Sequence, residues 1–128
     1  MVAYKPLGCW KDEVRRALPL LEGTSKHLNV HYKRRTNEVV QCGLAALEKG
    51  LSTFAVQDGG QCFGMRGATT ESYQKYGKST YCDSDGTGGP MANNVYRFGM
   101  FSFKHFISYA NIINIHQQLQ IMNDKILI

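Results

Sequence analysis

The chain has no long apolar run, and this absence limits where it can lie in a cell. No stretch of its 128 residues approaches the roughly 18 consecutive apolar residues of a membrane-spanning helix. The opening residues, Met1 to Pro6, also lack the apolar segment of a secretion signal. We therefore expect no membrane span, and we interpret the chain as a module of a longer secreted protein. A chain whose true start is missing is the alternative.

Catalytic and metal-binding motifs are missing as well. The sequence contains no Gly-x-Ser-x-Gly, P-loop or His-Glu-x-x-His motif, and Asp58 is a lone carboxylate without a partner at a recognisable spacing. It has no Cys-x-x-Cys pair, which excludes the usual zinc-ribbon and thioredoxin-type sites. His27 and His31 stand four residues apart, but the residues between them show no helical pattern. We predict neither an enzyme nor a bound metal or cofactor.

Positive charge is in excess and is concentrated in one segment. Lys and Arg number 15 against 10 Asp and Glu, a formal net charge of +5. A solvated basic loop is the simplest interpretation of the consecutive Lys33, Arg34 and Arg35. The alternative is that these three residues form a patch that binds sulfated or acidic polysaccharide. No recognised nucleic-acid-binding motif is present, so nucleic acid is not an expected partner.

A second group of charges follows the first predicted strand. Arg15 and Arg16 can pair with Asp12 or Glu13, or bind a carboxylate of a ligand. We expect an ion pair at the surface, which is the commoner arrangement.

Four cysteines are present, Cys9, Cys42, Cys62 and Cys82. An even number of widely spaced cysteines is typical of a disulfide framework, and four cysteines permit three pairings that the residues alone leave open. Disulfides form in oxidising compartments, so we expect an extracellular protein, secreted or at the cell surface. A domain of this size also benefits from covalent links because its core is modest.

Residue patterns predict one strand before a single long helix and three strands after it. Residues 4–10 favour an edge strand because they contain Pro6. Residues 53–57 alternate as a strand does, and Asp58-Gly59-Gly60 predicts a tight turn that returns the chain along residues 61–64. Residues 95–98 predict the closing strand.

The segment after residue 36 has the pattern of that helix. Thr36 or Asn37 can cap its start, and Gly50 stands where a helix should end. Cys42 lies next to the apolar face that this helix would have. The predicted face comprises Val40, Gly43, Leu44 and Leu47.

A long loop, residues 65–94, is rich in Gly, Ser, Thr and Tyr. A loop of that length in a compact domain needs a tether or a function, and Cys82 supplies a tether. Residues 83–88 partly match a calcium loop, but position 94 is Asn where the full pattern needs Glu. We predict instead a turn in which Asp side chains accept hydrogen bonds from nearby N–H groups.

The composition changes after Phe98. We predict a domain over residues 1–98 and an extension over residues 99–128, in which helical spacing favours a short helix at Phe103, Phe106, Ile107 and Ala110.

Three motifs occur in a distinctive order. The first is Leu7-Gly8-Cys9-Trp10-Lys11-Asp12 with Arg16-Ala17-Leu18-Pro19, the second runs from Phe54 to Gly64 around Cys62, and the third runs from Gly88 to Arg97. Together they resemble WSC-type domains, the cysteine-rich carbohydrate-binding modules of cell-surface proteins. The match is to a four-cysteine variant found beside thrombospondin-type repeats in secreted animal proteins, and it covers residues 4–98. WSC domains usually carry eight cysteines, so their sugar specificity is not assumed.

The resemblance implies a fold, a disulfide pairing and a function. The fold is α+β, with one helix packed on a short antiparallel sheet and with long loops. The implied disulfides are Cys42–Cys62 and Cys9–Cys82. The implied function is extracellular binding or adhesion, with a glycan or another component of the extracellular matrix as partner. A structural protein–protein interaction module, contacting other domains of a longer parent chain, is the alternative.

The long loop and its ends carry the residue types that bind neutral sugars. Such binding uses flat aromatic rings together with short amides or carboxylates. The alternative is structural: Tyr76 and Tyr81 pack the loop down, and Asn94 caps a turn. The candidate ligand residues are Gln57, Asp58, Tyr73, Tyr76, Asn93 and Asn94.

Overall fold

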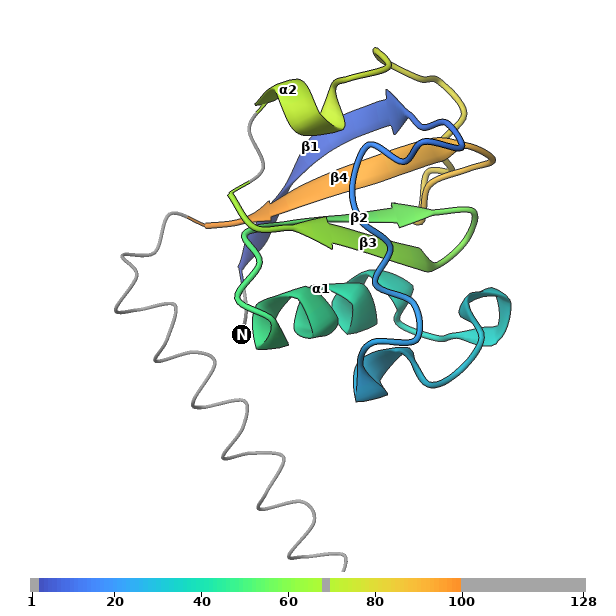
Figure 1. The fold of residues 1–128 in the computed structure, drawn as a ribbon. Helices are drawn as coiled ribbons and strands as arrows, with labels where there is room; N and C mark the ends of the chain where they lie inside the picture. Colours follow the sequence, from blue (N-terminus) through green and yellow to red (C-terminus); the bar gives the residue numbers. More distant parts are fainter. Residues whose placement is uncertain (1–2, 68–69, 100–128) are drawn as a thin grey trace, which may run out of the picture. The chain divides into compact units, whose positions relative to one another are not determined.

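A computed structural model describes residues 3–67 and 70–99 (Figure 1). Ala3–Gly99 forms one compact unit. The predictions made for residues 100–128, the short helix included, lie outside the described residues. The elements in chain order are β1 (Tyr4–Lys11), the 3-10 turns η1 (Lys26–Leu28) and η2 (Tyr32–Arg34), α1 (Glu38–Glu48), β2 (Thr53–Gln57), β3 (Gln61–Met65), α2 (Thr70–Tyr73) and β4 (Ala92–Phe98).

The four strands form one antiparallel sheet in the order β1-β4-β2-β3 (Figure 1). The predicted hairpin is confirmed as β2 and β3. β1 is an edge strand, as Pro6 indicated, and the pairing shifts register between Pro6 and Gly8, as at a β-bulge. The last strand, β4, lies between β1 and β2, and it begins three residues earlier than the predicted 95–98.

Helix α1 packs against one face of this sheet (Figure 1). Its buried side is centred on Cys42, Ala45 and Ala46, each 0% exposed. Val40 is 47% exposed, so its predicted place on the apolar face is wrong. The helix turns by about 100° per residue, and a face centred on Cys42 leaves a residue two positions earlier at the solvent side.

The two ends of α1 follow the prediction only in part. Asn37 is the residue before the helix, but it has a φ of 52° and its side chain makes no capping hydrogen bond. At the other end Gly50 has a φ of 71°, which glycine adopts without strain, and its N–H donates to the carbonyl of Leu47 at 3.0 Å.

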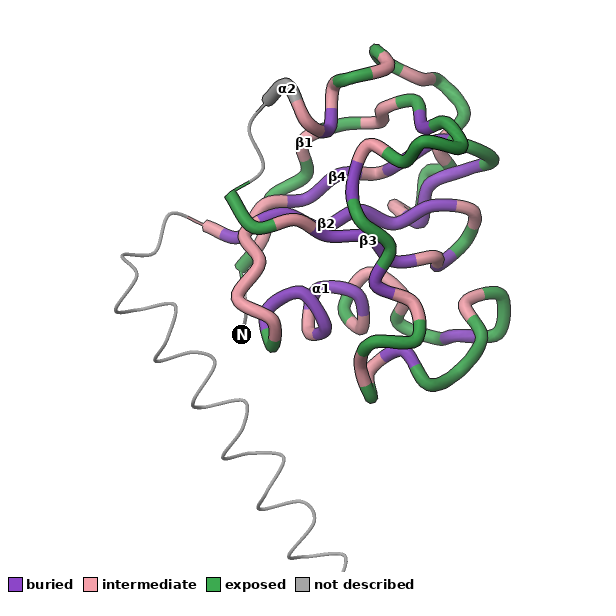
Figure 2. Tube along the Cα trace, viewed as in Figure 1, coloured by how far each residue is buried: buried purple, intermediate pink, exposed green. Residues whose placement is uncertain are grey.

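Both faces of β2 are covered, so all of its residues are buried (Figure 2). On the α1 side the ring of Phe54 stacks on Tyr96 with centroids 5.2 Å apart, and the absent side chain of Gly43 leaves room for it on the helix. On the opposite side a second cluster of buried apolar residues fills the space. Its members are Leu18, Ala55, Phe63, Tyr73 and Val95.

All four cysteines are paired, as Cys42–Cys62 and Cys9–Cys82. This is the pairing that the resemblance implied and that the residues alone left open. The first bond joins α1 to β3, and the second ties β1 to the long loop. The protein is therefore a small disulfide-linked α+β domain.

The predicted turn at residues 83–88 is confirmed. Asp85 Oδ1 accepts hydrogen bonds from the hydroxyl of Thr87 at 2.6 Å and from its backbone N–H at 3.1 Å. Since these bonds favour the ionised carboxylate, they hold the pKa of Asp85 below its ordinary value.

Candidate functional site

Three of the six candidate ligand residues are buried. Gln57, Tyr73 and Asn93 are 2%, 5% and 1% exposed. Tyr73 belongs to the core, where its ring meets Trp10 edge to face at 5.4 Å. The prediction that these three side chains contact a ligand at the surface is therefore wrong. Tyr73 packs in the core, and Gln57 and Asn93 hydrogen-bond to each other inside the domain.

The other three candidates are half-buried and differ in what they do. Asn94 Oδ1 accepts a hydrogen bond from the Gly88 N–H at 2.8 Å, so this side chain holds a turn, as the structural alternative predicted. The hydroxyl of Tyr76 donates to the backbone carbonyl of Arg15 and packs the loop down. The carboxylate of Asp58 accepts from the Tyr32 hydroxyl at 3.3 Å.

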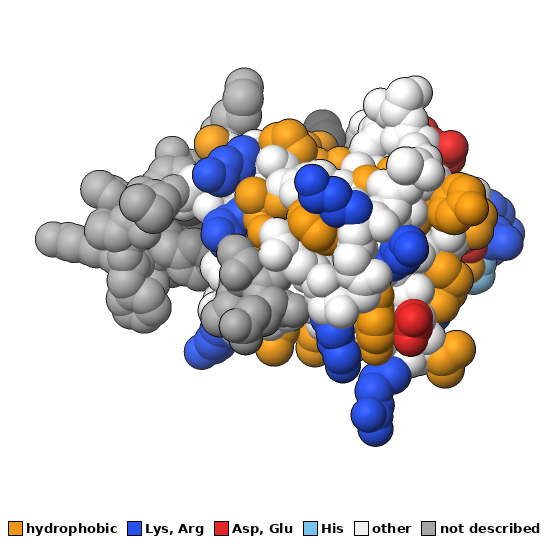
Figure 3. Space-filling view, turned by 90° about the horizontal axis from the view of Figure 1, so that it is seen from above, with side chains coloured by type: hydrophobic (Ala, Val, Ile, Leu, Met, Phe, Trp, Pro, Cys, Tyr) orange, Lys and Arg blue, Asp and Glu red, His pale blue; other side chains and the backbone are white. Residues whose placement is uncertain are grey.

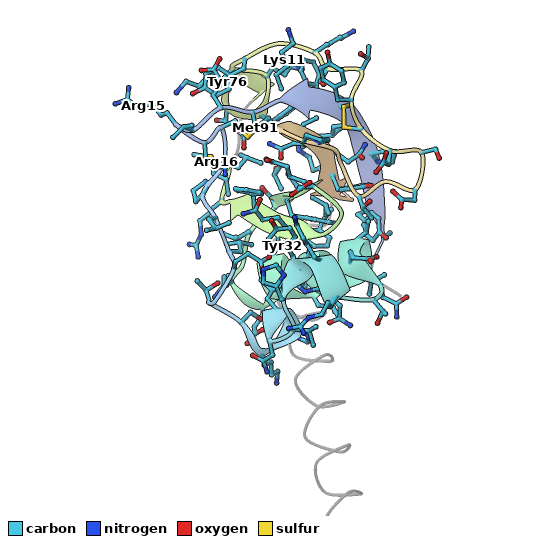
Figure 4. All side chains as sticks on the ribbon, turned by 90° about the vertical axis from the view of Figure 1, so that its right-hand side faces the viewer. Lys11, Arg15, Arg16, Tyr32, Tyr76 and Met91 are labelled. Atoms are coloured by element: carbon cyan, nitrogen blue, oxygen red, sulfur yellow. A yellow bond between two sulfur atoms is a disulfide. The ribbon has the colours of Figure 1, made fainter. Side chains whose placement is uncertain are left out.

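Asp58 and Tyr76 lie at the same end of the sheet, the end that faces the viewer in Figure 4. There the loop after β1 meets the β2–β3 turn and the loop before β4. Backbone hydrogen bonds connect them: Asp12 N–H donates to Met91 O at 2.8 Å, and Asp58 N–H donates to Gly89 O at 3.2 Å. We call this surface the sheet end and define it by residues 11–16, 32, 58–59, 74–77 and 89–91.

A polar network lies beneath the sheet end. Gln57 Nε2 donates to Asp12 Oδ2 at 2.8 Å and to Asn93 Oδ1 at 2.9 Å. Gln57 Oε1 accepts from Arg16 Nη1 at 3.3 Å, and the same Nη1 donates to Asp12 Oδ2 at 3.1 Å. Each group of the Gln57 amide thus meets a partner of the complementary kind, which fixes the orientation of the amide.

Arg16 connects this network to the surface. The side chain of Asp12 is 0% exposed, whereas that of Arg16 is 33% exposed. A buried carboxylate is costly unless it is paired and hydrogen-bonded, and Asp12 also accepts from the Ala17 N–H at 2.9 Å. The predicted ion pair is therefore present, but its acidic member lies inside the domain and not at the surface.

Backbone strain is concentrated at the same place. Among the described residues, three that are not glycine have a positive φ: Asn37 at 52°, Asp58 at 51° and Met91 at 50°. Two of them belong to the sheet end. Met91 is 39% exposed, and its sulfur lies 3.4 Å from Arg16 Nη1. Left-handed backbone costs a residue with a side chain roughly 1–2 kcal/mol, and strain of this kind is often retained where a protein binds or reacts.

The basic run at residues 33–35 is divided by burial. Lys33 and Arg34 are exposed. Arg35 is 5% exposed, and its guanidinium binds the Glu22 carboxylate at 2.6 and 3.0 Å. It also donates to the carbonyls of Leu28, Val30 and Gly60 at 3.2, 2.8 and 3.0 Å. The prediction that Arg35 belongs to a surface patch for anionic glycans is therefore wrong, because this side chain holds the loop together.

A hollow of about 230 Å³ lies next to this run. One of its lining residues is His27, whose pKa is lowered from 6.5 because burial disfavours the charged form, although the Glu48 carboxylate 3.6 Å away opposes the shift. The hollow is lined by Lys26, His27, Asn29, Val30, Arg34, Arg35, Thr36 and Gln41.

Positive charge elsewhere is spread out. On the face seen from above Figure 1, Lys and Arg side chains stand at separate places with hydrophobic side chains between them (Figure 3). The positive charge on this face therefore does not form one broad basic surface.

Sequence reasoning proposed Asp58 and Tyr76 as candidates but did not predict the network beneath the sheet end. Asp12 and Arg16 carried a signal, since they are opposite charges four residues apart. Met91 carried none, because its exposure and its positive φ result from a turn that sequence patterns did not predict.

No protein-family model and no curated protein matches this sequence. Over the described ranges, 3–67 and 70–99, no helix has the length and apolar character needed to cross a bilayer. In the same part of the chain no group of three or more His, Cys, Asp or Glu side chains is arranged to hold a metal ion.

Proposed function

We propose that this chain is an extracellular binding module that holds a glycan at the sheet end. The observation that supports the proposal best is the network of Asp12, Arg16, Gln57 and Asn93, which keeps the partly exposed Arg16 guanidinium in one orientation at the sheet end. The two disulfides favour an oxidising compartment, which agrees with an extracellular site of action.

The sheet end offers the two kinds of contact that a sugar uses. Sugar hydroxyls need donors and acceptors, and the C–H faces of the ring need flat apolar groups. The carboxylate of Asp58 is an acceptor at this surface. The rings of Tyr32 and Tyr76 are tethered through their hydroxyls, and Tyr32 is also stacked on His31 with centroids 4.6 Å apart.

This tethering lowers the cost of binding. A side chain that is already ordered loses less conformational freedom when a ligand arrives, and each immobilised side chain otherwise costs about 0.5–1.5 kcal/mol. We expect weak binding at a single site, with a Kd of about 1 mM or roughly 4 kcal/mol. Repetition of the module in a longer chain would raise the avidity.

A glycan array probed with the full chain tests the proposal, with two tyrosine variants as a matched pair. Tyr76→Ala removes a tethered ring from the sheet end, and we expect it to lower binding several-fold. Tyr81→Ala removes a ring that is 71% exposed and lies outside the sheet end, and we expect binding to be unchanged. Circular dichroism first establishes that both variants are folded.

Two outcomes would count against the sheet end. Loss of binding in Tyr81→Ala with full binding in Tyr76→Ala would show that the glycan binds elsewhere on the loop, near Tyr81. Binding of the intact chain to no glycan on the array would favour the structural interaction module, for which Val14, a sheet-end side chain that is 91% exposed, is the first residue to test.

A further inference from the structure

Arg16 carries hydrogen-bond donors that have no partner among the described residues. Its Nη1 donates to Asp12 Oδ2 and Gln57 Oε1 and contacts the sulfur of Met91. Within residues 3–67 and 70–99, no hydrogen bond joins Arg16 Nε or Nη2 to the protein. A guanidinium is planar, so the N–H groups on Nε and Nη2 point in parallel along one edge. A third of the side chain is exposed, so a ligand at the sheet end can reach Arg16.

The guanidinium is held in place before any ligand binds. Its Nη1 is bound to two groups of the network, and the Phe63 ring lies against its face with 5.4 Å from Cζ to the ring centroid. The backbone around it is also constrained, because Asp12 accepts from the N–H of Ala17, the next residue. Figure 4 shows Arg16 beside Met91 at the end of the domain. Most of the ordering cost of an arginine contact is therefore met during folding.

We infer that the sheet end binds an acidic sugar and that Arg16 contacts its carboxylate through the Nε and Nη2 edge. Two parallel N–H donors match the two oxygens of a planar carboxylate, a pairing that adds both strength and orientation. A hydroxyl of the same sugar can bind Asp58, which is a neighbour of Gln57 in the chain. This inference rests on the proposed function and names the ligand class of that site.

The preference for an acidic sugar over a neutral one would come from the geometry of the Arg16 donors and not from the net charge of the surface. The ionised side chains of the sheet end and its network nearly balance, with four cations against three carboxylates. They are Lys11, Arg15, Arg16 and Lys75 against Asp12, Glu13 and Asp58. Removing another exposed cation from the same surface should therefore matter little. Arg15 is the matched control: it is adjacent in sequence, exposed and of equal charge.

The test compares two sugars that differ only at one carbon, methyl β-glucuronide and methyl β-glucoside, by NMR titration of the full chain labelled with ¹⁵N. We expect the intact protein to bind the glucuronide at least about fivefold more tightly. Arg16→Lys keeps the charge but loses the parallel donors, and it should reduce the preference to less than about twofold. Arg15→Lys and Arg15→Gln should retain it.

Retention of the full preference by Arg16→Lys, or an equal loss in the Arg15 variants, would overturn the inference. Equal binding of both sugars, or binding of neither, by the intact protein would overturn it too. The glycan array tests the proposed function separately. Binding of a neutral glycan that depends on Tyr76 would support glycan binding at the sheet end even if Arg16 does not bind a carboxylate. If Arg16→Lys loses its dispersed amide signals, the double variant Asp12→Asn with Arg16→Gln, which removes both charges, takes its place with the same expected result.

Discussion

Substitution of Arg35 should lower the stability of the domain, and substitution of its neighbour Arg34 should not, although the sequence gives no reason to distinguish them. Arg35→Lys keeps the positive charge but replaces a planar fork with an ammonium that has three donors. The guanidinium makes five hydrogen bonds, two to Glu22 and three to backbone carbonyls. Lysine therefore leaves at least two of these acceptors without a partner.

The size of the effect follows from these bonds. At about 1–1.5 kcal/mol each, two or three lost bonds cost about 2–4 kcal/mol. Arg35 Nε is buried without a hydrogen-bond partner among the described residues, and its removal returns about 1 kcal/mol. The net loss is about 2 kcal/mol, which in a domain of this size lowers Tm by roughly 10 °C.

Thermal unfolding of the full chain, followed by circular dichroism, measures this difference. Arg34→Lys is the control, because Arg34 is exposed and carries the same charge. A Tm for Arg35→Lys within about 2 °C of the Arg34→Lys value would refute the reasoning, since it would show that the bonds of Arg35 contribute no net stability.

Three further outcomes are expected. Burial lowers the pKa of His27 from 6.5, so the unfolded chain takes up this proton first, and stability should fall as the pH drops below 6.5; urea unfolding at several pH values should show a smaller drop for His27→Gln. Gly60→Ala should destabilise the domain more than Gly59→Ala in the same assay. At Gly60 the new Cβ would lie 2.6 Å from the backbone oxygen of Tyr32, whereas at Gly59 it would meet no atom within 4 Å and the only cost is the strain of a φ of 86°. Heparin retention at low salt should fall when Lys33 and Arg34 are both changed to Gln, and unchanged retention would exclude these residues from an anion-binding surface.

Local patterns predicted the local structure well. Helix α1 and the β2–β3 hairpin depend on residues close in sequence, and both were found within one or two residues of the prediction. The place of β4 was not predicted, since pairing between the first and last strands is set by contacts far apart in the chain. Val40 was misplaced because one apolar side chain at the edge of a helical pattern can face either way.

The site was harder to predict for a related reason. Gln57 and Asn93 are polar and stand next to turns, which is typical of surface residues. They are buried because Asp12, 45 residues from Gln57 in sequence, enters the domain and supplies a partner. Likewise nothing local separates Arg35 from Arg34, and only the distant Glu22 and Gly60 decide which arginine turns inward.

Because β4 lies between β1 and β2, the strand that joins the two parts of the sheet is synthesised last, and the sheet cannot form completely until residue 98 has left the ribosome. Before that point β1 has no partner strand, and β2 presents an open edge of unpaired N–H and C=O groups. The Cys42–Cys62 bond can close early, as its loop is short, but it does not cover that edge. Chains interrupted before residue 92 should therefore be prone to strand pairing with one another, which makes late synthesis the vulnerable stage in the life of this domain.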